Sequence, residues 1–186
     1  MADVTSGYRQ ENGVSLIEIR LSNILQLFNS FDPSPFQEKD LDREAEAYIV
    51  ESAREFPRAA PLKLVLYVPS KEMAAAEDAK VEQAVQHYFG YRLWLERAVL
   101  RHLLITGRVS LAIGLVFLFT CITLREFITM SETSTFREII AEGLLISGWV
   151  AMWKPLEVFL YEWWPIRRNC RLYEKLSRLP VELRLR

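Results

Sequence analysis

The stretch VSLAIGLVFLFTCITL, residues 109–124, contains no charged side chain and decides the class of this protein. Arg108 precedes it and Arg125 follows it. Its sixteen residues would cover about 24 Å as a helix, which is shorter than the roughly 30 Å hydrocarbon core of a bilayer. The apolar residues 103–105 lengthen the run, so we predict a transmembrane helix over residues 103–128.

A second apolar stretch, IIAEGLLISGWVAMW at residues 139–153, follows after a short polar segment. We predict a second transmembrane helix over residues 136–160 and an external loop over residues 129–135, which together make a helical hairpin. Tryptophan and tyrosine gather toward the far end of the second span, as is typical of the boundary between a membrane and water. They are Trp149, Trp153, Tyr161, Trp163 and Trp164.

Lysine and arginine beside the spans predict the orientation, because positively charged flanks stay in the cytoplasm. These residues precede the first span and follow the second: Arg92, Arg97, Arg101 and Arg108, then Lys154, Arg167, Arg168, Arg171 and Lys175. The connecting segment holds only Arg125 and Arg137, offset by Glu126 and Glu132. We therefore expect a multi-pass protein with both termini in the cytoplasm.

The composition and net charge exclude several classes of function. The chain of 186 residues has a formal net charge of −1, which argues against bulk binding of nucleic acid. Its two cysteines lack a CxxC spacing and its two histidines are fifteen positions apart, so neither pair suggests a metal site. We predict no metal and no cofactor. The polar N-terminus lacks the apolar core of a signal peptide, so the first span is expected to target the chain.

Residues 13–75 are predicted to form a cytosolic α/β domain. Strand patterns cover residues 14–21 and 62–68, and an amphipathic helical pattern covers residues 40–56. This order fits a βαβ unit, whose strands are parallel. Because two strands alone are marginally stable, we expect that a partner copy completes the sheet or that a helix covers it.

The remaining segments are a disordered N-terminus over residues 1–12, a juxtamembrane helix over residues 76–102 and a tail over residues 161–186. The tail alternates apolar side chains with arginine and lysine at helical spacing. We predict that it is a basic amphipathic helix that lies on anionic headgroups, with cover of the acidic N-terminal helix as the alternative. Its leading basic residues are Arg167, Arg168 and Arg171.

The predicted fold class is an α+β membrane protein. A small cytosolic βαβ-type N-terminal domain is followed by a long helix and a two-helix transmembrane hairpin. The expected partners are the lipid bilayer, with anionic headgroups at the basic tail, and further protein chains in a homo-oligomer or a larger membrane complex. No nucleic acid is expected among them.

Four polar residues near the N-terminal helix are candidates for a site. Asp32 and Ser34 lie in the proline loop FDPSPF, and Asp40 and Asp42 stand at the start of the predicted helix. Prolines make rigid connectors, and acidic residues in a first helical turn favour the helix dipole. Structural roles are therefore favoured over catalysis or metal binding for these residues.

Two ionisable residues of the second span, Glu142 and Lys154, are also candidates, because buried charges in a membrane are functional hypotheses by default. By the helical rise, Glu142 is about 9 Å from the start of the span and Lys154 about 18 Å beyond it. These depths favour boundary charges over a proton path. We predict boundary charges, with a functional path as the alternative.

Three segments carry a resemblance to a known family: LFNSFDPSPFQEKDLDREAEAYI at residues 27–49, EGLLISGWVAMWKPLEVFLYEWWPIRR at residues 142–168 and RLYEKLSRLPVE at residues 171–182. Over roughly residues 16–182 the chain resembles a family of uncharacterised bacterial inner-membrane proteins. The resemblance implies a cytosolic N-terminal domain, a C-terminal two-span hairpin and a location in the bacterial inner membrane. It implies no catalytic residue, cofactor or ligand.

The sequence contains no nucleophile–base pattern, Walker motif or dinucleotide fingerprint. We therefore expect a non-enzymatic, membrane-anchored scaffold or accessory subunit whose cytosolic domain docks a partner or self-associates. The first alternative is a subunit of an oligomeric small transporter or channel, with Glu142, Ser147 and Lys154 along its path. The second is a membrane-tethered enzyme that uses the aspartates and Ser34 of the proline loop region.

Overall fold

The chain is mixed α/β, with a small sheet and long helices, and it divides into two compact units. The computed structural model describes residues 7–33, 35, 39–57, 59–78, 80–130 and 135–186. The first unit joins residues 1–95 with residues 169–186, and the second comprises residues 96–168. The first unit is therefore larger than the predicted domain over residues 13–75, because it draws on chain from both sides of the hairpin.

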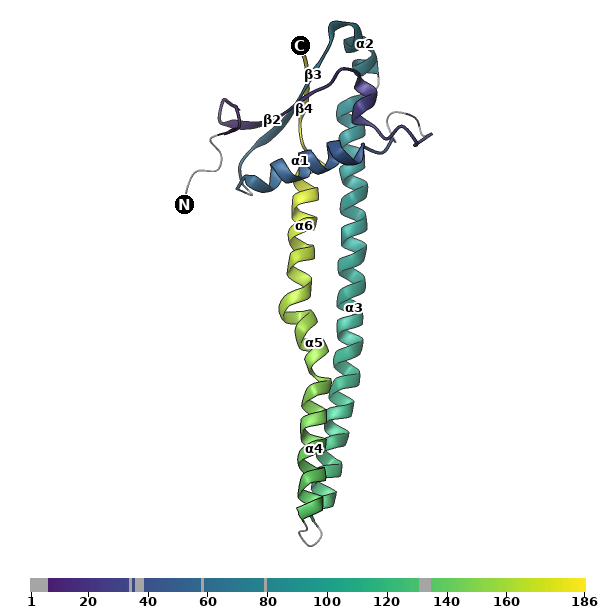
Figure 1. Ribbon diagram of the computed structural model, residues 1–186, viewed down its shortest axis with the longest axis vertical. Coiled ribbons are helices and arrows are strands. Elements are labelled where there is room, and N and C mark those ends of the chain that lie inside the picture. The colour runs from purple at the N-terminus through teal and green to yellow at the C-terminus, as the bar shows by residue number, and fades with distance from the viewer. Residues whose placement is uncertain (1–6, 34, 36–38, 58, 79, 131–134) are drawn as a thin grey trace. The chain divides into compact units, whose positions relative to one another are not determined.

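The first unit contains a sheet of four strands in the order β1-β2-β3-β4. The strands are β1 (Gln10–Glu11), β2 (Val14–Arg20), β3 (Leu62–Val68) and β4 (Val181–Leu185). β1 is antiparallel to β2, whereas β3 is parallel to β2 on one side and to β4 on the other. Figure 1 labels β2, β3 and β4. The predicted parallel pairing of two strands is confirmed, but the same chain supplies the two strands that complete the sheet.

The turn between β1 and β2 follows from two residues. Asn12 and Gly13 both have a positive φ, of 51° and 77°. An Asn-Gly pair with two positive φ angles is the usual type I′ turn of a two-residue hairpin, because glycine carries no Cβ and asparagine tolerates this region. Residues 1–12 are consequently not all disordered as predicted: Gln10–Glu11 form a strand, and residues 1–6 lie outside the described part of the chain.

Helices connect the strands of this unit. A short 3₁₀ turn, η2 (Ile24–Leu27), precedes α1 (Arg43–Glu55), which matches the predicted helix over residues 40–56. α2 (Ser70–Asp78) and α3 (Val81–Thr129) follow β3. The predicted juxtamembrane helix over residues 76–102 is interrupted at Lys80, whose φ of 48° is incompatible with a right-handed helix.

The apolar face of the sheet forms the core with the helices. The chain advances from β2 to β3 and from β3 to β4 in the same direction, so right-handed crossovers place the intervening helices on the same face. Register puts Ile17 beside Leu64 and Ile19 beside Leu66 on that face. Buried residues of the helices include Ile49, Ala53, Val85, Phe89, Tyr173 and Leu176.

The C-terminal segment differs most from the prediction. Residues 161–186 were expected to form one basic amphipathic tail on lipid, but α6 (Trp163–Leu176) is followed by β4, which pairs with β3. The apolar side of α6 packs into the first unit, where Cys170, Tyr173 and Leu176 are buried. Amphipathic spacing indicates that one face of a helix is buried, but it does not distinguish burial against lipid from burial against protein.

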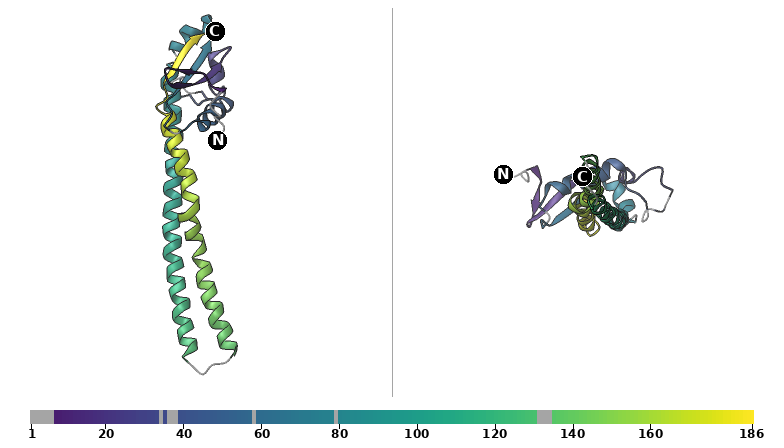
Figure 2. Two further views of the ribbon diagram at one scale, coloured as in Figure 1. Left: turned by 90° about the vertical axis from the view of Figure 1, so that its left-hand side faces the viewer. Right: turned by 90° about the horizontal axis from the view of Figure 1, so that it is seen from below.

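The second unit is a pair of antiparallel helical segments (Figure 2). One is the part of α3 from residue 96 onward. The other contains α4 (Thr135–Ala151), α5 (Trp153–Glu157), the π-helical turn η3 (Val158–Glu162) and the start of α6. The predicted spans over residues 103–128 and 136–160 lie within the helical stretches Val81–Thr129 and Thr135–Leu176, and residues 131–134 of the predicted loop lie outside the described chain.

Both helical stretches, Val81–Thr129 and Thr135–Leu176, are long and apolar enough to cross a membrane. Only 11% and 17% of their most apolar windows are buried within the protein. A core helix of a water-soluble protein would bury most of such a window, whereas a lipid-facing helix leaves it open. Exposed apolar side chains such as Val116, Phe119 and Trp149 are consistent with contact to lipid.

The two segments approach each other at glycines. A Cβ on Gly107 would lie 2.6 Å from Val158 Cγ1, and a Cβ on Gly148 would lie 2.8 Å from Leu118 Cδ1. On Gly114 it would meet the carbonyl oxygen of residue 151 at 3.2 Å. Small residues let helix backbones come close in a membrane. A Cβ on Gly143 of the same helix as Gly148 would meet nothing within 4 Å.

Candidate docking site

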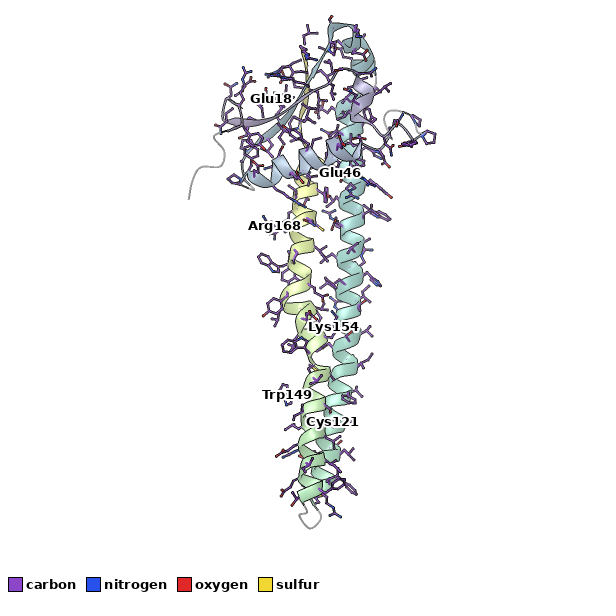
Figure 3. The ribbon with its side chains drawn as sticks, viewed as in Figure 1. Glu18, Glu46, Cys121, Trp149, Lys154 and Arg168 are labelled. Atoms are coloured by element: carbon purple, nitrogen blue, oxygen red, sulfur yellow. The ribbon has the colours of Figure 1, made fainter. Side chains whose placement is uncertain are left out.

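A polar cluster joins three helical segments of the first unit. The Tyr88 hydroxyl donates a hydrogen bond of 2.6 Å to Glu46 Oε2, and Arg92 Nε forms an ion pair with Glu46 Oε1 at 2.9 Å. This Nε has no hydrogen-bond partner among the described residues, so the pair is close but poorly aligned. Arg92 also lies over the Tyr173 ring, 5.5 Å from its centroid. Glu46 is labelled in Figure 3.

The cluster has a structural rather than a catalytic character. Burial, together with the Glu46 carboxylate, raises the pKa of the Tyr88 hydroxyl well above its usual range, so this group stays a hydrogen-bond donor at neutral pH. The carboxylate is occupied by two partners from α3, and α6 adds an aromatic face beneath the guanidinium. The arrangement ties α1 and α6 to the first turns of α3.

We expect Glu46→Gln to lower the free energy of unfolding of the first unit by about 2 kcal/mol, because hydrogen bonds to charged groups contribute about 1.5–3 kcal/mol each. Chemical unfolding followed by circular dichroism would measure it. Glu44→Gln on the same helix is the matched control, because Glu44 is exposed in the first turn of α1. Equal losses for the two variants would contradict a role for the cluster.

The polar face of the sheet carries a charged network from its two outer strands. Arg184 of β4 makes a bidentate pair with Glu11 of β1, with donor–acceptor distances of 2.8 and 2.6 Å. Its Nε also donates to Glu182 Oε1 at 2.7 Å, and Lys63 Nζ donates to Glu182 Oε2 at 2.7 Å. The bidentate geometry is the strongest kind of carboxylate pairing.

This network lies on the same face of the sheet as two buried apolar side chains. By register, Val65 lies on the same face as Glu182, and Leu16 lies on the same face as Lys63. Val65 is 0% exposed and Leu16 is 1% exposed. Val65 and Leu16 are therefore buried on the face of the sheet that carries the charged network.

The same network gives the first unit an acid-sensitive element. The Arg184 hydrogen bond, followed by that of Lys63, lowers the pKa of the Glu182 carboxyl from 4.5 to about 2. A carboxyl whose pKa is lower in the folded state stabilises the fold above its unfolded pKa. This stabilisation is lost as pH falls from 4.5 toward 2. We expect Glu182→Gln to flatten the fall of the melting temperature between pH 5 and about 2.5, measured by circular dichroism. An unchanged profile would contradict this assignment.

β4 is the outer strand of the sheet, and within the described chain no strand pairs with its far edge. On the inner side, Leu64 N donates to Pro180 O at 2.9 Å and Arg186 N donates to Val68 O at 3.0 Å. In a parallel strand, every second residue forms its backbone hydrogen bonds with the same neighbouring strand. The even-numbered residues of β4 therefore form backbone hydrogen bonds with β3. The outward-facing backbone groups therefore belong to Val181, Leu183 and Leu185.

This edge is open to a further strand. The Val181 amide makes a long contact of 3.4 Å with Glu82 Oε1, and the amides of Leu183 and Leu185 have no hydrogen-bond partner among the residues that the structure describes. Sheets commonly protect such an edge with lysine, proline or a bulge. The strand, VELRL, contains neither lysine nor proline, and its two charges are held in the network on the polar face.

The aspartates predicted near the proline loop have backbone partners. Asp32 Oδ2 accepts a hydrogen bond of 2.7 Å from Asp40 N, and Asp42 is the N-cap of α1, accepting from Glu44 N at 2.9 Å. Ser34 lies outside the described residues. Asp32 thus closes a loop, and Asp42 begins α1.

Lys154 is paired within its own helix. Its Nζ lies 3.3 Å from Glu157 Oε2 and 2.6 Å from Glu162 Oε1. Positions eight apart are about 80° from alignment in an α-helix, but the wider π turn η3 takes up one residue and restores the alignment of an i, i+7 pair. The pairing of Lys154 with Glu162 could not be predicted from the sequence, because no residue pattern in this segment indicates a π turn. Lys154 is labelled in Figure 3.

The second charge of this span does not join Lys154. Glu142 is exposed on α4, and Ser147, five residues later, is about 140° away around the helix. Ser147 donates to Gly143 O at 2.8 Å. A straight path along α4 would pass one of these two side chains but not both, so this geometry gives the channel alternative no support.

The three predicted arginines of the tail lie at the surface: Arg167, Arg168 and Arg171 are exposed. Arg167 lies over the Trp163 ring, 5.6 Å from its centroid. Arg171 lines an open groove of about 470 Å³ together with Glu174, Lys175 and Arg178. The basic face of α6 is thus available to a charged partner, although its apolar face is used by the first unit.

Within the described residues, no group of three or more histidine, cysteine, aspartate or glutamate side chains is placed to hold a metal ion. No family model, curated protein or solved structure matched this chain. The open edge of β4 is therefore the candidate site that rests most directly on geometry. The sequence pattern did not indicate this edge, because residues 181–185 were predicted to belong to the amphipathic tail.

Proposed function

We propose that this protein is a non-enzymatic, membrane-anchored docking subunit. A hairpin of two transmembrane helices would hold the small α/β unit at the cytoplasmic face of a bacterial inner membrane. The open edge of β4 would receive a protein partner. Strand addition to a free edge supplies affinity through backbone hydrogen bonds and specificity through alternate side chains.

One observation carries the proposal: β3 and β4 are neighbours in one sheet, although the whole hairpin lies between them in the sequence. Strands on either side of the hairpin can pair only if both are on the same side of the membrane. The pairing supports a position for both strands on the same side of the membrane, and the arginine and lysine flanks favour the cytoplasmic side. It also makes the edge strand available only after the hairpin has formed.

The topology can be tested by labelling cysteine variants in intact cells with a membrane-impermeant maleimide. Met130, at the end of α3, is 86% exposed, and Arg186 follows β4. We expect Met130→Cys to react from outside and Arg186→Cys to react only after permeabilisation. The native chain is the control, because Cys121 and Cys170 are buried. External labelling of Arg186→Cys would overturn the proposed orientation.

The docking role is tested by the mass of the complex extracted in lipid nanodiscs, with every chain identified by mass spectrometry. A complex of fixed stoichiometry supports a docking subunit, whether it contains another protein or several copies of this chain. A single chain on its own, in nanodiscs and after cross-linking in membranes, would overturn the proposal.

The basic face of α6 supports a second contact of the same subunit, with anionic headgroups. Arg167, Arg168 and Arg171 are exposed, and each cation near an anionic surface contributes about 1 kcal/mol. Replacement of all three by glutamine should reduce the amount of phosphatidylglycerol retained in native mass spectra, with phosphatidylcholine retention as the control. Equal retention of phosphatidylglycerol would contradict the contact.

A further inference from the structure

We propose that a second copy of this chain occupies the open edge, through antiparallel pairing of the two β4 strands around a two-fold axis at Leu183. The proposal rests on the docking role above and names its partner. Closed two-fold dimers are the commonest oligomers, and their interface is the same patch on both copies. In such an interface the strand pairs with a copy of itself that runs in the opposite direction. The residues that then lie opposite each other must be compatible in hydrogen bonding, size and charge.

The backbone of β4 meets this condition. In an antiparallel ladder, residues whose amides and carbonyls face the partner exchange two hydrogen bonds with the residue opposite. With the axis at Leu183, this residue faces its own copy, and Val181 faces Leu185. All three have their backbone groups on the open edge, so the register forms about six hydrogen bonds without disturbing the ladder to β3.

The side chains meet the condition as well. The strand VELRL has the pattern apolar, acidic, apolar, basic, apolar. Read from the other end, the apolar positions stay the same and the acidic and basic residues exchange places. In this register Glu182 therefore lies opposite Arg184, in the pairs where side chains approach most closely. Leu185, which is 60% exposed in the single chain, lies opposite Val181. No like charges face each other, so charge complementarity favours a second copy over an unrelated strand.

The Val181 amide must exchange its long contact with Glu82 for the partner carbonyl. This exchange replaces a hydrogen bond of 3.4 Å and leaves the network around Arg184 in place. A ladder of five residues is a small interface, well below a standard area of about 1,600 Å². Anchoring both copies in the same membrane raises their effective concentration and compensates for this size.

Disulfide cross-linking in native membranes tests the register. With the axis at Leu183, the two Cα atoms of this position lie about 5.5 Å apart, inside the range of about 4.4–6.8 Å that a disulfide spans. The two Leu185 positions would lie about 14 Å apart. We expect oxidation to give a dimer from Leu183→Cys and none from Leu185→Cys, above the background of the native chain. Equal cross-linking of both variants, or none of either, would overturn the register.

A proline variant tests the edge itself. Leu183→Pro removes an amide that faces the open edge and leaves the amides of Glu182 and Arg184 bonded to β3, as proline tolerates on an outer strand. Leu183→Ala is the matched control, because it removes the same side chain and keeps the amide. In nanodiscs we expect Leu183→Ala to keep the dimer mass and Leu183→Pro to lose it at least tenfold in dimer fraction, with unchanged circular dichroism.

The outcomes separate this inference from the docking role. A dimer that survives Leu183→Pro in a folded chain would overturn pairing through β4. Release of a different protein by Leu183→Pro would also overturn it while leaving the docking role intact. Absence of any second chain would overturn both.

Discussion

Deletion of residues 181–186 should unfold the first unit while leaving the hairpin helical. β3 would become an outer strand, and Leu64, Leu66 and Val68, which are 0% exposed, would lose the neighbour that covers their edge. The ladder to β4 comprises about six hydrogen bonds at about 1 kcal/mol each, comparable to the whole stability of a small domain. The charged network would also lose Arg184, which is its centre.

Hydrogen exchange of the β3 amides in nanodiscs measures this effect. In the native chain residues 64–68 should be among the most protected, and after the deletion they should exchange like an unfolded segment. A full-length chain with Arg171→Gln and Arg178→Gln is the control, because it removes two charges from the C-terminal segment but keeps β4. If this segment acted only as a lipid-binding tail, the deletion would leave the β3 amides protected, and that result would contradict the sheet topology.

Gly148→Leu should separate the helices of the second unit. A Cβ at this position already comes within 2.8 Å of Leu118 Cδ1 and 3.3 Å of Cys121 Cβ, so a leucine side chain has no room. Overpacking of this kind costs about 1–3 kcal/mol. Because a helix in a membrane associates mainly through close packing, little else would hold this contact. Figure 3 marks Cys121 and Trp149, which lie on the two segments.

Gly143→Leu is the matched control, since Gly143 lies on the same helix and a Cβ added there would meet no atom within 4 Å. Both variants gain about 1 kcal/mol of helix propensity relative to glycine, so any difference between them reports the contact. Unfolding by sodium dodecyl sulfate in mixed micelles, followed by tryptophan fluorescence, would measure the difference. Equal midpoints for the two variants would show that Gly148 does not lie in a helix contact.

The sequence pattern correctly predicted those elements that depend on residues close together in the chain. The uncharged run over residues 109–124 indicated a span, because its composition alone makes transfer to lipid favourable. Asp42 marked the start of α1, since a helix cap acts on the nearest turn of backbone. The interpretation of Asp32 and Asp42 as structural residues agrees with their hydrogen bonds for the same reason.

The sequence by itself therefore determined two apolar helices and a parallel βαβ core. Only the tertiary structure decided that the C-terminal segment pairs with β3 as strand β4, that Glu11 pairs with Arg184 and that the far edge of β4 is open. These depend on contacts between residues far apart in the chain: Glu11 and Arg184 are 173 positions apart. The spacing of apolar residues determines which face of an element is buried, but the partner of that face is selected by the packing of the whole chain.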